Sequence, residues 1–305
     1  MIMTNYSIKK KFLAVSLIFG ALSAWPMYQV FAPRIQKKIM VLNSQPTLEQ
    51  IQKTVTEISQ AVSNVADTVA QELNAEHDRL LAELQKEFPM QEEWTEMLKE
   101  IAQLKAEDTL SCDNPIIKNA DNEHEIVKRV RELLAEYFIN PEVVQIHATH
   151  DPASKSFISA GQGYGAGKVI HELKINIANF SKRSQAIQEA IMRHEIMHLL
   201  HYDSLEYSFI ISLLEENGIE PQTYKNNPVF KAYCKHKELR ADLIAASSDL
   251  TIATAFQKDF ERALTTSPED YAQLFTTHPS KKQRHEAMNI LMSYLDAEKQ
   301  QTRSA

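Results

Sequence analysis

The 305-residue chain has few glycines, few cysteines and no excess of positive charge. Only six residues are glycine, and the many Ala, Leu, Glu, Gln and Lys residues favour helices. Two cysteines, Cys112 and Cys234, are too few for a disulfide scaffold, and one bridge or two free thiols fit the sequence equally well. The formal net charge of −7 argues against a nucleic-acid partner. These features indicate a helix-rich globular protein.

The chain contains a single long apolar run near its N-terminus. Three lysines at positions 9–11 precede Phe12–Phe31, which is about the 20 residues that one membrane span requires. The run is typical of a cleaved signal peptide or of a single membrane anchor, and residues 1–32 are expected to be one of the two. The remainder is then expected to be anchored to the membrane or secreted across it. Basic residues flank the run on both sides, so charge does not fix the orientation of an anchor; the extracytoplasmic (periplasmic) side is favoured, and a cytosolic domain is the alternative.

Residues 33–110 follow with a strongly helical pattern. Apolar residues recur at 3-4 spacing over residues 48–69, about three heptads, which is the minimum for a coiled coil. A second amphipathic helix is expected over Trp94–Ala106. Two interpretations remain open: a stalk that forms a homo-oligomer through residues 48–69, and a helical hairpin that packs on its own chain.

The most specific motif in the chain reads His-Glu-Ile-Met-His from His194 to His198. On a helix these two histidines stack one turn apart, so both imidazoles can reach one Zn²⁺ at about 2.0–2.1 Å. Glu195 lies roughly 100° round the helix, beside the metal, where it can take a proton from a water molecule. The alternative is two packed helix histidines beside a surface glutamate.

A third ligand is expected from a second helix. Residues 236–246 read as a helix, on which Glu238 and Asp242 share one face. A carboxylate at Glu238 completes a two-His, one-Glu site that leaves one metal position for water. Asp242 can accept the second ring N–H of a ligating histidine and fix its tautomer. Taken alone, this pattern also fits an ordinary charged helix face.

A His-Pro turn introduces one more helix near the C-terminus. His278 precedes Pro279, which favours extended backbone, and Ser280 is a natural N-cap for a helix that carries Arg284 in its first turns. A histidine and an arginine beside a zinc site can stabilise the oxyanion of a tetrahedral intermediate. The alternative interpretation is a capped surface helix.

Together and in this order, HEIMH, ELRAD and THPSKKQR resemble the motifs of gluzincin zinc metallopeptidases of the HtpX and CAAX-prenyl-endopeptidase type. The resemblance covers roughly residues 140–295. It implies one Zn²⁺ per chain, a polypeptide substrate and a catalytic domain within residues 111–296. The residues that it implies are the zinc ligands His194, His198 and Glu238, the general base Glu195, the orienting carboxylate Asp242, and the pair His278 and Arg284.

Four of the six glycines fall together at positions 161, 163, 165 and 167. Ser156–Ala160 and Lys168–Ile177 read as strands on either side, so the cluster is expected to be a mobile hairpin loop. The resemblance makes the first strand an exposed edge that pairs with substrate. The substrate-contact residues would then be Ser156, Phe157, Ile158, Ser159, Ala160 and Gly161. A plain surface hairpin is equally compatible with the pattern.

The expected fold is α+β and helix-rich. A zincin-like domain with a small β-sheet, including a strand at 143–148, surrounds the HExxH helix, and residues 297–305 form a polar tail. The expected function is that of a zinc-dependent endopeptidase, which hydrolyses peptide bonds of extended or misfolded protein segments in membrane or envelope quality control. The alternative is a latent or non-catalytic zinc-binding module of the same fold, with a chaperone-like or assembly role.

Overall fold

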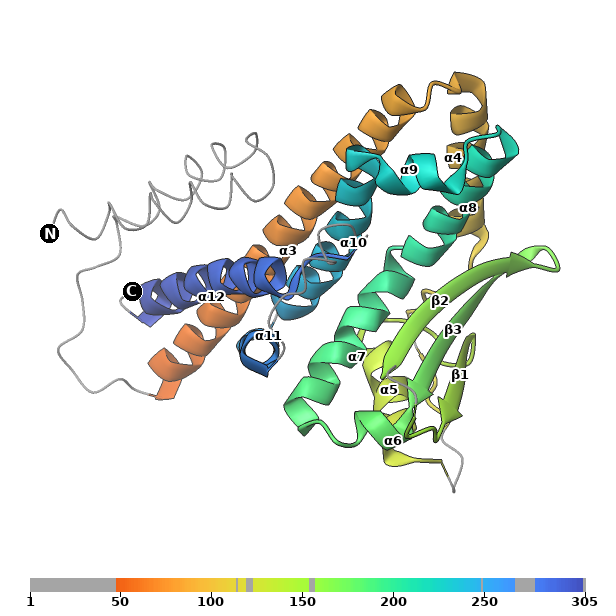
Figure 1. Ribbon diagram of the computed structural model, residues 1–305. Helices are drawn as coiled ribbons and strands as arrows, with labels where there is room; N and C mark the ends of the chain where they lie inside the picture. The colour runs from red at the N-terminus through yellow and green to blue at the C-terminus, as the bar shows by residue number, and fades with distance from the viewer. Residues whose placement is uncertain are drawn as a thin grey trace, which may run out of the picture.

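The computed structural model describes residues 48–113, 115–118, 123–153, 157–247, 249–266 and 278–303. Within these residues the chain is helix-rich and contains one three-stranded sheet, which confirms the α+β class (Figure 1). The expected signal peptide or anchor lies outside the described residues. None of the described helices combines the length and apolar character that a membrane crossing requires.

The first two described helices form a hairpin that packs on the rest of the chain. Helix α3 (Leu48–Glu87) runs along α10 (Pro228–Ser247) and α12 (Lys281–Arg303), while α4 (Gln91–Glu107) packs on α8 (Asp203–Glu216) (Figure 1). The side chains of residues 48–65 lie outside the described part, so the coiled-coil prediction stays a prediction.

The hairpin shares its hydrophobic cores with the segment that carries the HExxH motif. Trp94 is fully buried, and its indole N–H donates to the carbonyl of Phe88 at 2.8 Å, which closes the turn between the two helices. Leu84 and Trp94 belong to one cluster with Tyr233 of α10, and Leu73 belongs to the central core. From residue 66 onward, α3 and α4 therefore form a helical hairpin that packs on its own chain.

The sheet has the strand order β1-β3-β2. Strand β1 (Val144–Thr149) pairs parallel with β3 (Lys168–Asn176), and β2 (Ile158–Gly165) pairs antiparallel with the other side of β3. Helix α5 (Glu125–Glu136) precedes the sheet and packs against α7 (Gln185–Leu200). Strand β2 is therefore an edge strand of the described sheet, as the sequence predicted.

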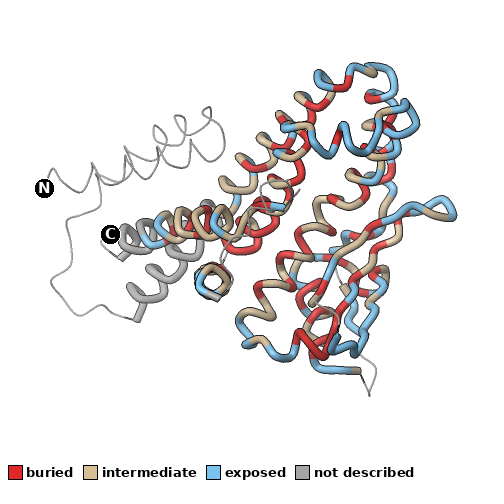
Figure 2. The backbone as a smooth tube through the Cα atoms, in the orientation of Figure 1, coloured by how far each residue is buried: buried red, intermediate tan, exposed pale blue. Residues whose placement is uncertain are grey.

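The prediction of a glycine loop is wrong for three of the four glycines. Gly161, Gly163 and Gly165 lie within β2 in register with β3, and only Ala166 and Gly167 form the turn, with φ of 52° and 78°. Extended glycines pair with a neighbouring strand as other residues do, so their number alone did not define a loop. Figure 2 shows that this end of the hairpin is exposed.

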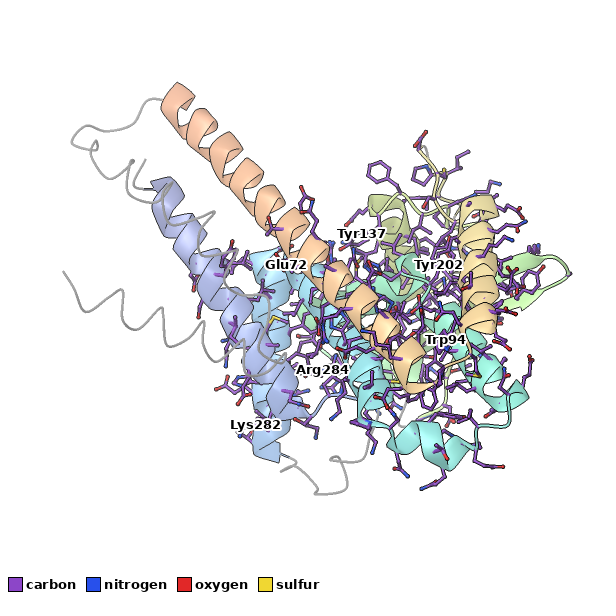
Figure 3. The ribbon with its side chains drawn as sticks, turned by 90° about the horizontal axis from the view of Figure 1, so that it is seen from above. Glu72, Trp94, Tyr137, Tyr202, Lys282 and Arg284 are labelled. Atoms are coloured by element: carbon purple, nitrogen blue, oxygen red, sulfur yellow. The ribbon has the colours of Figure 1, made fainter. Side chains whose placement is uncertain are left out.

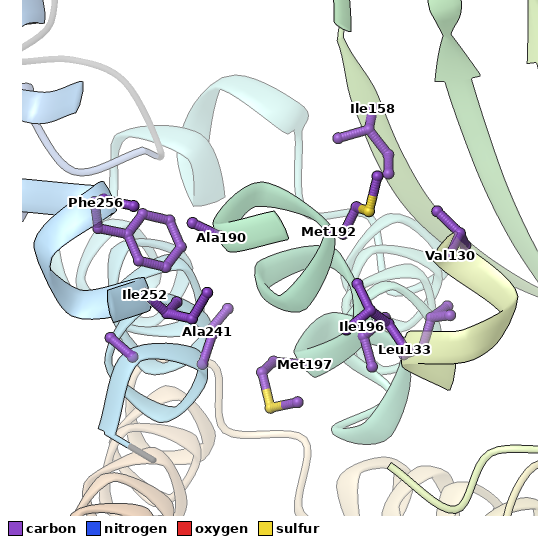
Figure 4. Packing of buried hydrophobic residues seen from close by; sticks show 14 of the residues in the cluster. Val130, Leu133, Ile158, Ala190, Met192, Ile196, Met197, Ala241, Ile252 and Phe256 are labelled. Atoms are coloured by element: carbon purple, nitrogen blue, oxygen red, sulfur yellow. The ribbon is translucent and has the colours of Figure 1, made fainter. Parts of the chain in front are cut away.

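Helix α7 lies between the sheet and the C-terminal helices. In Figure 4, Met192 and Ile196 point toward the sheet and α5, whereas Ala190 points toward Phe256 of α11 (Leu250–Thr266). This central position explains why α7 is buried on more than one side and holds its side chains rigidly. Two short helices, α6 (Ile177–Phe180) and α9 (Pro221–Asn226), complete the described elements.

The C-terminal helix begins at the predicted cap and runs further than expected. The Ser280 hydroxyl accepts from the Gln283 N–H at 3.1 Å, and the Gln283 side chain accepts from the Ser280 N–H at 2.9 Å, which is a capping box. Helix α12 then continues to Arg303, past the point where a polar tail was expected.

Both cysteines are free thiols, and burial raises the pKa of Cys234 to about 12.

Candidate metal centre

Two helices bring three donor side chains together. Helix α7 supplies His194 and His198 from consecutive turns, and α10 supplies Glu238. The two Nε2 atoms lie 3.0 Å apart, and the Glu238 oxygens lie 3.7 Å from His194 Nε2 and 3.8 Å from His198 Nε2. Ligands bound tetrahedrally at about 2.0–2.1 Å are about 3.3 Å from one another. The three donors therefore have the spacing of a metal site.

Asp242 lies beside the first histidine, one helical turn after Glu238. Its Oδ1 lies 2.8 Å from His194 Nδ1. Arg284 of α12 is labelled in Figure 3. It donates from Nε and Nη2 to the two oxygens of the same carboxylate, both at 2.6 Å. Burial would raise the pKa of Asp242, but Arg284 and His194 lower it, so the carboxylate is charged. Arg284 thus reaches the centre through Asp242.

A second carboxylate, which the sequence did not reveal, orients the other histidine. Asp203 Oδ2 lies 2.7 Å from His198 Nδ1. Its other oxygen pairs with Arg240, and Lys237 donates to its main-chain carbonyl at 3.0 Å. Asp203 follows Tyr202, whose φ of 57° turns the chain sharply between α7 and α8. Helical spacing stops at that turn, so it could not place Asp203 beside His198.

The orientation of the two histidines favours a cation between them. Nδ1 of His194 lies 2.8 Å from Asp242 and Nδ1 of His198 lies 2.7 Å from Asp203, which favours the tautomer with the proton on Nδ1 in each ring. The two Nε2 lone pairs then face each other across 3.0 Å, which is unfavourable unless a proton or metal ion lies between them. Burial lowers the pKa of His198, but Asp203 outweighs burial and raises it to about 9. A bound metal ion would replace that proton.

Glu238 faces a third histidine from the C-terminal side. His278 Nδ1 lies 3.4 Å from Glu238 Oε1, although the His278 side chain is 71% exposed. Burial would raise the pKa of Glu238, but His278, His194 and His198 hold it well below its usual range. His278 therefore approaches the centre through a contact with Glu238, the candidate carboxylate ligand.

Glu195 connects the donor helix to the edge strand. Its side chain lines the same cavity as His194 and Glu238, and its Oε2 accepts a hydrogen bond from the Ala160 N–H at 2.6 Å. Strand β2 pairs with β3 through its other edge, so the Ala160 N–H points toward α7. The candidate general base is thereby aligned with the strand that was predicted to bind substrate.

The residues predicted to contact substrate lie in three places. Phe157 and Ile158 line the cavity beside the donors, and Ala160 bonds to Glu195. The alternation of a β-strand places Ser159, and Gly161 after it, on the opposite, outer face. Ser156 lies outside the described residues.

A buried polar layer links the centre to the α3–α4 hairpin. Glu206, one turn after Asp203 on α8, contacts His77 of α3 and accepts from the Tyr233 hydroxyl of α10, both at 2.7 Å. His77 and Glu206 are each 5% exposed. The first turn of α8 is therefore fixed from both sides, by the hairpin at Glu206 and by the metal centre at Asp203.

Comparison with family models, curated proteins and solved structures finds no match to this chain. The geometry of the donors, of Glu195 and of the adjoining cavity is therefore the basis for assigning a function.

Proposed function

We propose that the protein is a zinc-dependent endopeptidase of the gluzincin type, with a zincin-like catalytic domain. The observation that carries the proposal is the convergence of His194, His198 and Glu238, with each histidine oriented by its own carboxylate. Two nitrogens and one carboxylate oxygen are the donor set of a catalytic zinc site, which keeps one position open. The ordered resemblance to HtpX-type peptidases supports the same assignment.

The chain provides a base in the position that peptide hydrolysis requires. Bound zinc would polarise the scissile carbonyl and lower the pKa of the attacking water. Glu195 accepts a proton from that water while the water oxygen bonds to the carbonyl carbon. It then donates the proton to the leaving amine as the C–N bond breaks. The hydrogen bond from Ala160 keeps the Glu195 carboxylate in place.

Arg284 and His278, the two basic side chains near the centre, have different roles. Arg284 is buried against Asp242 through two hydrogen bonds, so its main contribution is to hold the partner of His194. His278 is exposed, and its pKa is raised by the hydrogen bond to Glu238. Of the two, His278 is the exposed side chain, and we assign the contact with the oxyanion to it.

The edge strand supports an extended polypeptide as substrate. A chain that pairs with the outward edge of β2 would pass the donors near Ala160 and Glu195. Extended or misfolded segments offer the free backbone that such pairing needs. A role in envelope protein quality control follows if the N-terminal run directs the domain across the membrane.

The decisive experiment compares the zinc-loaded protein with Glu195→Gln. Glutamine keeps the size of the side chain but cannot accept the proton, so cleavage of an unfolded protein substrate is expected to fall by about 100-fold or more. Zinc content, measured by mass spectrometry of the metal, should stay at one per chain in both proteins. Equal cleavage by both proteins would refute the proposed mechanism.

A second candidate function is favoured by the His278 contact. A histidine 3.4 Å from the carboxylate ligand could occupy the open metal position and leave the protein a latent or non-catalytic zinc-binding module. His278→Ala separates the two cases. Higher peptidase activity in this variant would indicate latency, whereas no activity in either protein, with zinc bound, would indicate a binding or assembly role.

A further inference from the structure

A cavity of about 330 Å³ adjoins the metal centre. At one end it is lined by the donors His194 and Glu238 and by Glu195. Its apolar wall comes from two facing helices: Ile187, Ala190 and Ile191 of α7, and Ala255, Phe256 and Phe260 of α11. Four charged or titratable residues line the remainder: Arg183, Asp259, His278 and Arg284. The apolar part runs from His194 back to Ile187, which is about 10 Å along the helix axis.

The charged and titratable residues beside this apolar wall are already paired. Arg183 forms an ion pair with Asp259 at 3.0 Å, and its guanidinium lies 4.6 Å from the centre of the Phe157 ring. Arg284 is held by Asp242, and His278 contacts Glu238. A charged substrate side chain would therefore lose its water in this cavity without gaining a partner, which is unfavourable.

The size and the walls of the cavity suit a ring. A cavity of about 150 Å³ is enough to hold benzene, so the volume here accommodates one large side chain beside the reacting groups. Phe256 and Phe260 stack with their centroids 5.7 Å apart, and Phe256 also meets the His194 ring edge-on at 6.5 Å. A further aromatic ring gains both apolar burial and favourable ring geometry against such walls.

We infer that this cavity is the specificity pocket of the enzyme and that it selects substrates with a large apolar, preferably aromatic, residue next to the scissile bond. The inference rests on the proposed peptidase function. The walls from α7 and α11 determine the size of the side chain, and the Arg183–Asp259 pair bounds the pocket. Ala255 is a specificity-determining position, because any larger residue there would occupy the pocket.

The test uses peptides of one sequence that differ only at a single residue X, which is Phe, Leu, Ala, Lys or Asp. The zinc-loaded full chain should cleave beside Phe with a kcat/KM at least about tenfold above that for Ala, and further above that for Lys or Asp. Mass spectrometry of the products identifies the bond that is cut. Binding of the same peptides to the Glu195→Gln protein, measured by calorimetry, should follow the same order without any turnover.

Two variants of α11 separate the pocket from general effects. Ala255→Leu is expected to lower kcat/KM for the Phe peptide by tenfold or more and to leave the Ala peptide within about twofold. Thr251→Leu, an exposed position on the same helix outside this cavity, should change neither value. Zinc content is measured for both variants, so that damage to the metal centre is recognised.

The outcomes distinguish this inference from the function on which it rests. Cleavage and binding that ignore the nature of X, or an equal loss for all peptides in zinc-loaded Ala255→Leu, would overturn the specificity pocket and leave the peptidase assignment standing. If Ala255→Leu does not fold, the preference of the unmodified chain decides alone. Absence of cleavage for every peptide, together with no preference in binding, would overturn both.

Discussion

The Asp203→Asn substitution removes one negative charge from a tightly packed position without a large change in size. Asp203 is 2% exposed and binds His198 at 2.7 Å, while its other oxygen pairs with Arg240. Asparagine would leave the buried Arg240 charge without its anionic partner, since the contact from Arg240 to Asn74 is long, at 3.4 Å. It would also stop holding a proton on His198 Nδ1.

Two losses of different size are expected. Loss of a carboxylate that orients a metal-bound histidine costs 10- to 100-fold in metal affinity, which is about 1.4–2.8 kcal/mol. An unpaired buried charge costs about 3–5 kcal/mol of folding stability. For Asp203→Asn, the decrease in the free energy of unfolding of the metal-free protein should therefore exceed the decrease in the free energy of zinc binding.

The assay pairs urea unfolding of the metal-free protein with chelator competition for zinc. The control is Asp259→Asn, which breaks the ion pair with Arg183. The Asp259 side chain is 21% exposed. A partly exposed pair contributes only about 0.2–1 kcal/mol, so the control should unfold almost like the parent and bind zinc equally. If Asp203→Asn folds and binds zinc as tightly as the control does, the assigned role of Asp203 is incorrect.

Three further predictions concern the centre and the hairpin turn. Arg284→Lys keeps the charge but loses the two hydrogen bonds to Asp242, so zinc affinity in chelator competition should fall about tenfold, while the circular dichroism spectrum stays unchanged. Unchanged affinity would contradict the role of Arg284 in holding Asp242. In the metal-free protein Asp203 outweighs burial and raises the pKa of His198 to about 9, and zinc must displace that proton. Affinity should therefore fall about tenfold per pH unit below pH 9, and a flat profile between pH 6.5 and 8.5 would contradict this. Ala166→Asn creates an Asn-Gly turn at φ of 52° and should stabilise the fold by about 1 kcal/mol in urea unfolding, whereas a loss would argue against the turn conformation.

Most of the metal centre could be predicted because it depends on helical spacing. His194 and His198 are four apart on one helix, and Glu238 and Asp242 are four apart on another, so each pair had to share a face. Asp203 was not predicted because Tyr202, whose backbone is in the left-handed region, separates it from the helix that carries His198. No periodic pattern crosses such a turn.

The fold was predictable in class but not in its contacts. The amphipathic pattern of residues 48–110 indicated helices, yet an apolar face does not specify what covers it, and the structure shows α10 and α8 in that place. The glycines of β2 were mistaken for a loop because their strand is stabilised by pairing with β3, which is a long-range contact. Tertiary pairing, not local preference, decided both features.

Zinc titration of the metal-free full chain, followed by calorimetry, tests the central claim most directly. We expect one zinc per chain, with proton release near neutral pH, and loss of that binding in His194→Asn, His198→Asn and Glu238→Gln proteins that still fold. Absence of zinc uptake, or uptake that survives all three substitutions, would contradict the assignment of a metal centre to these residues.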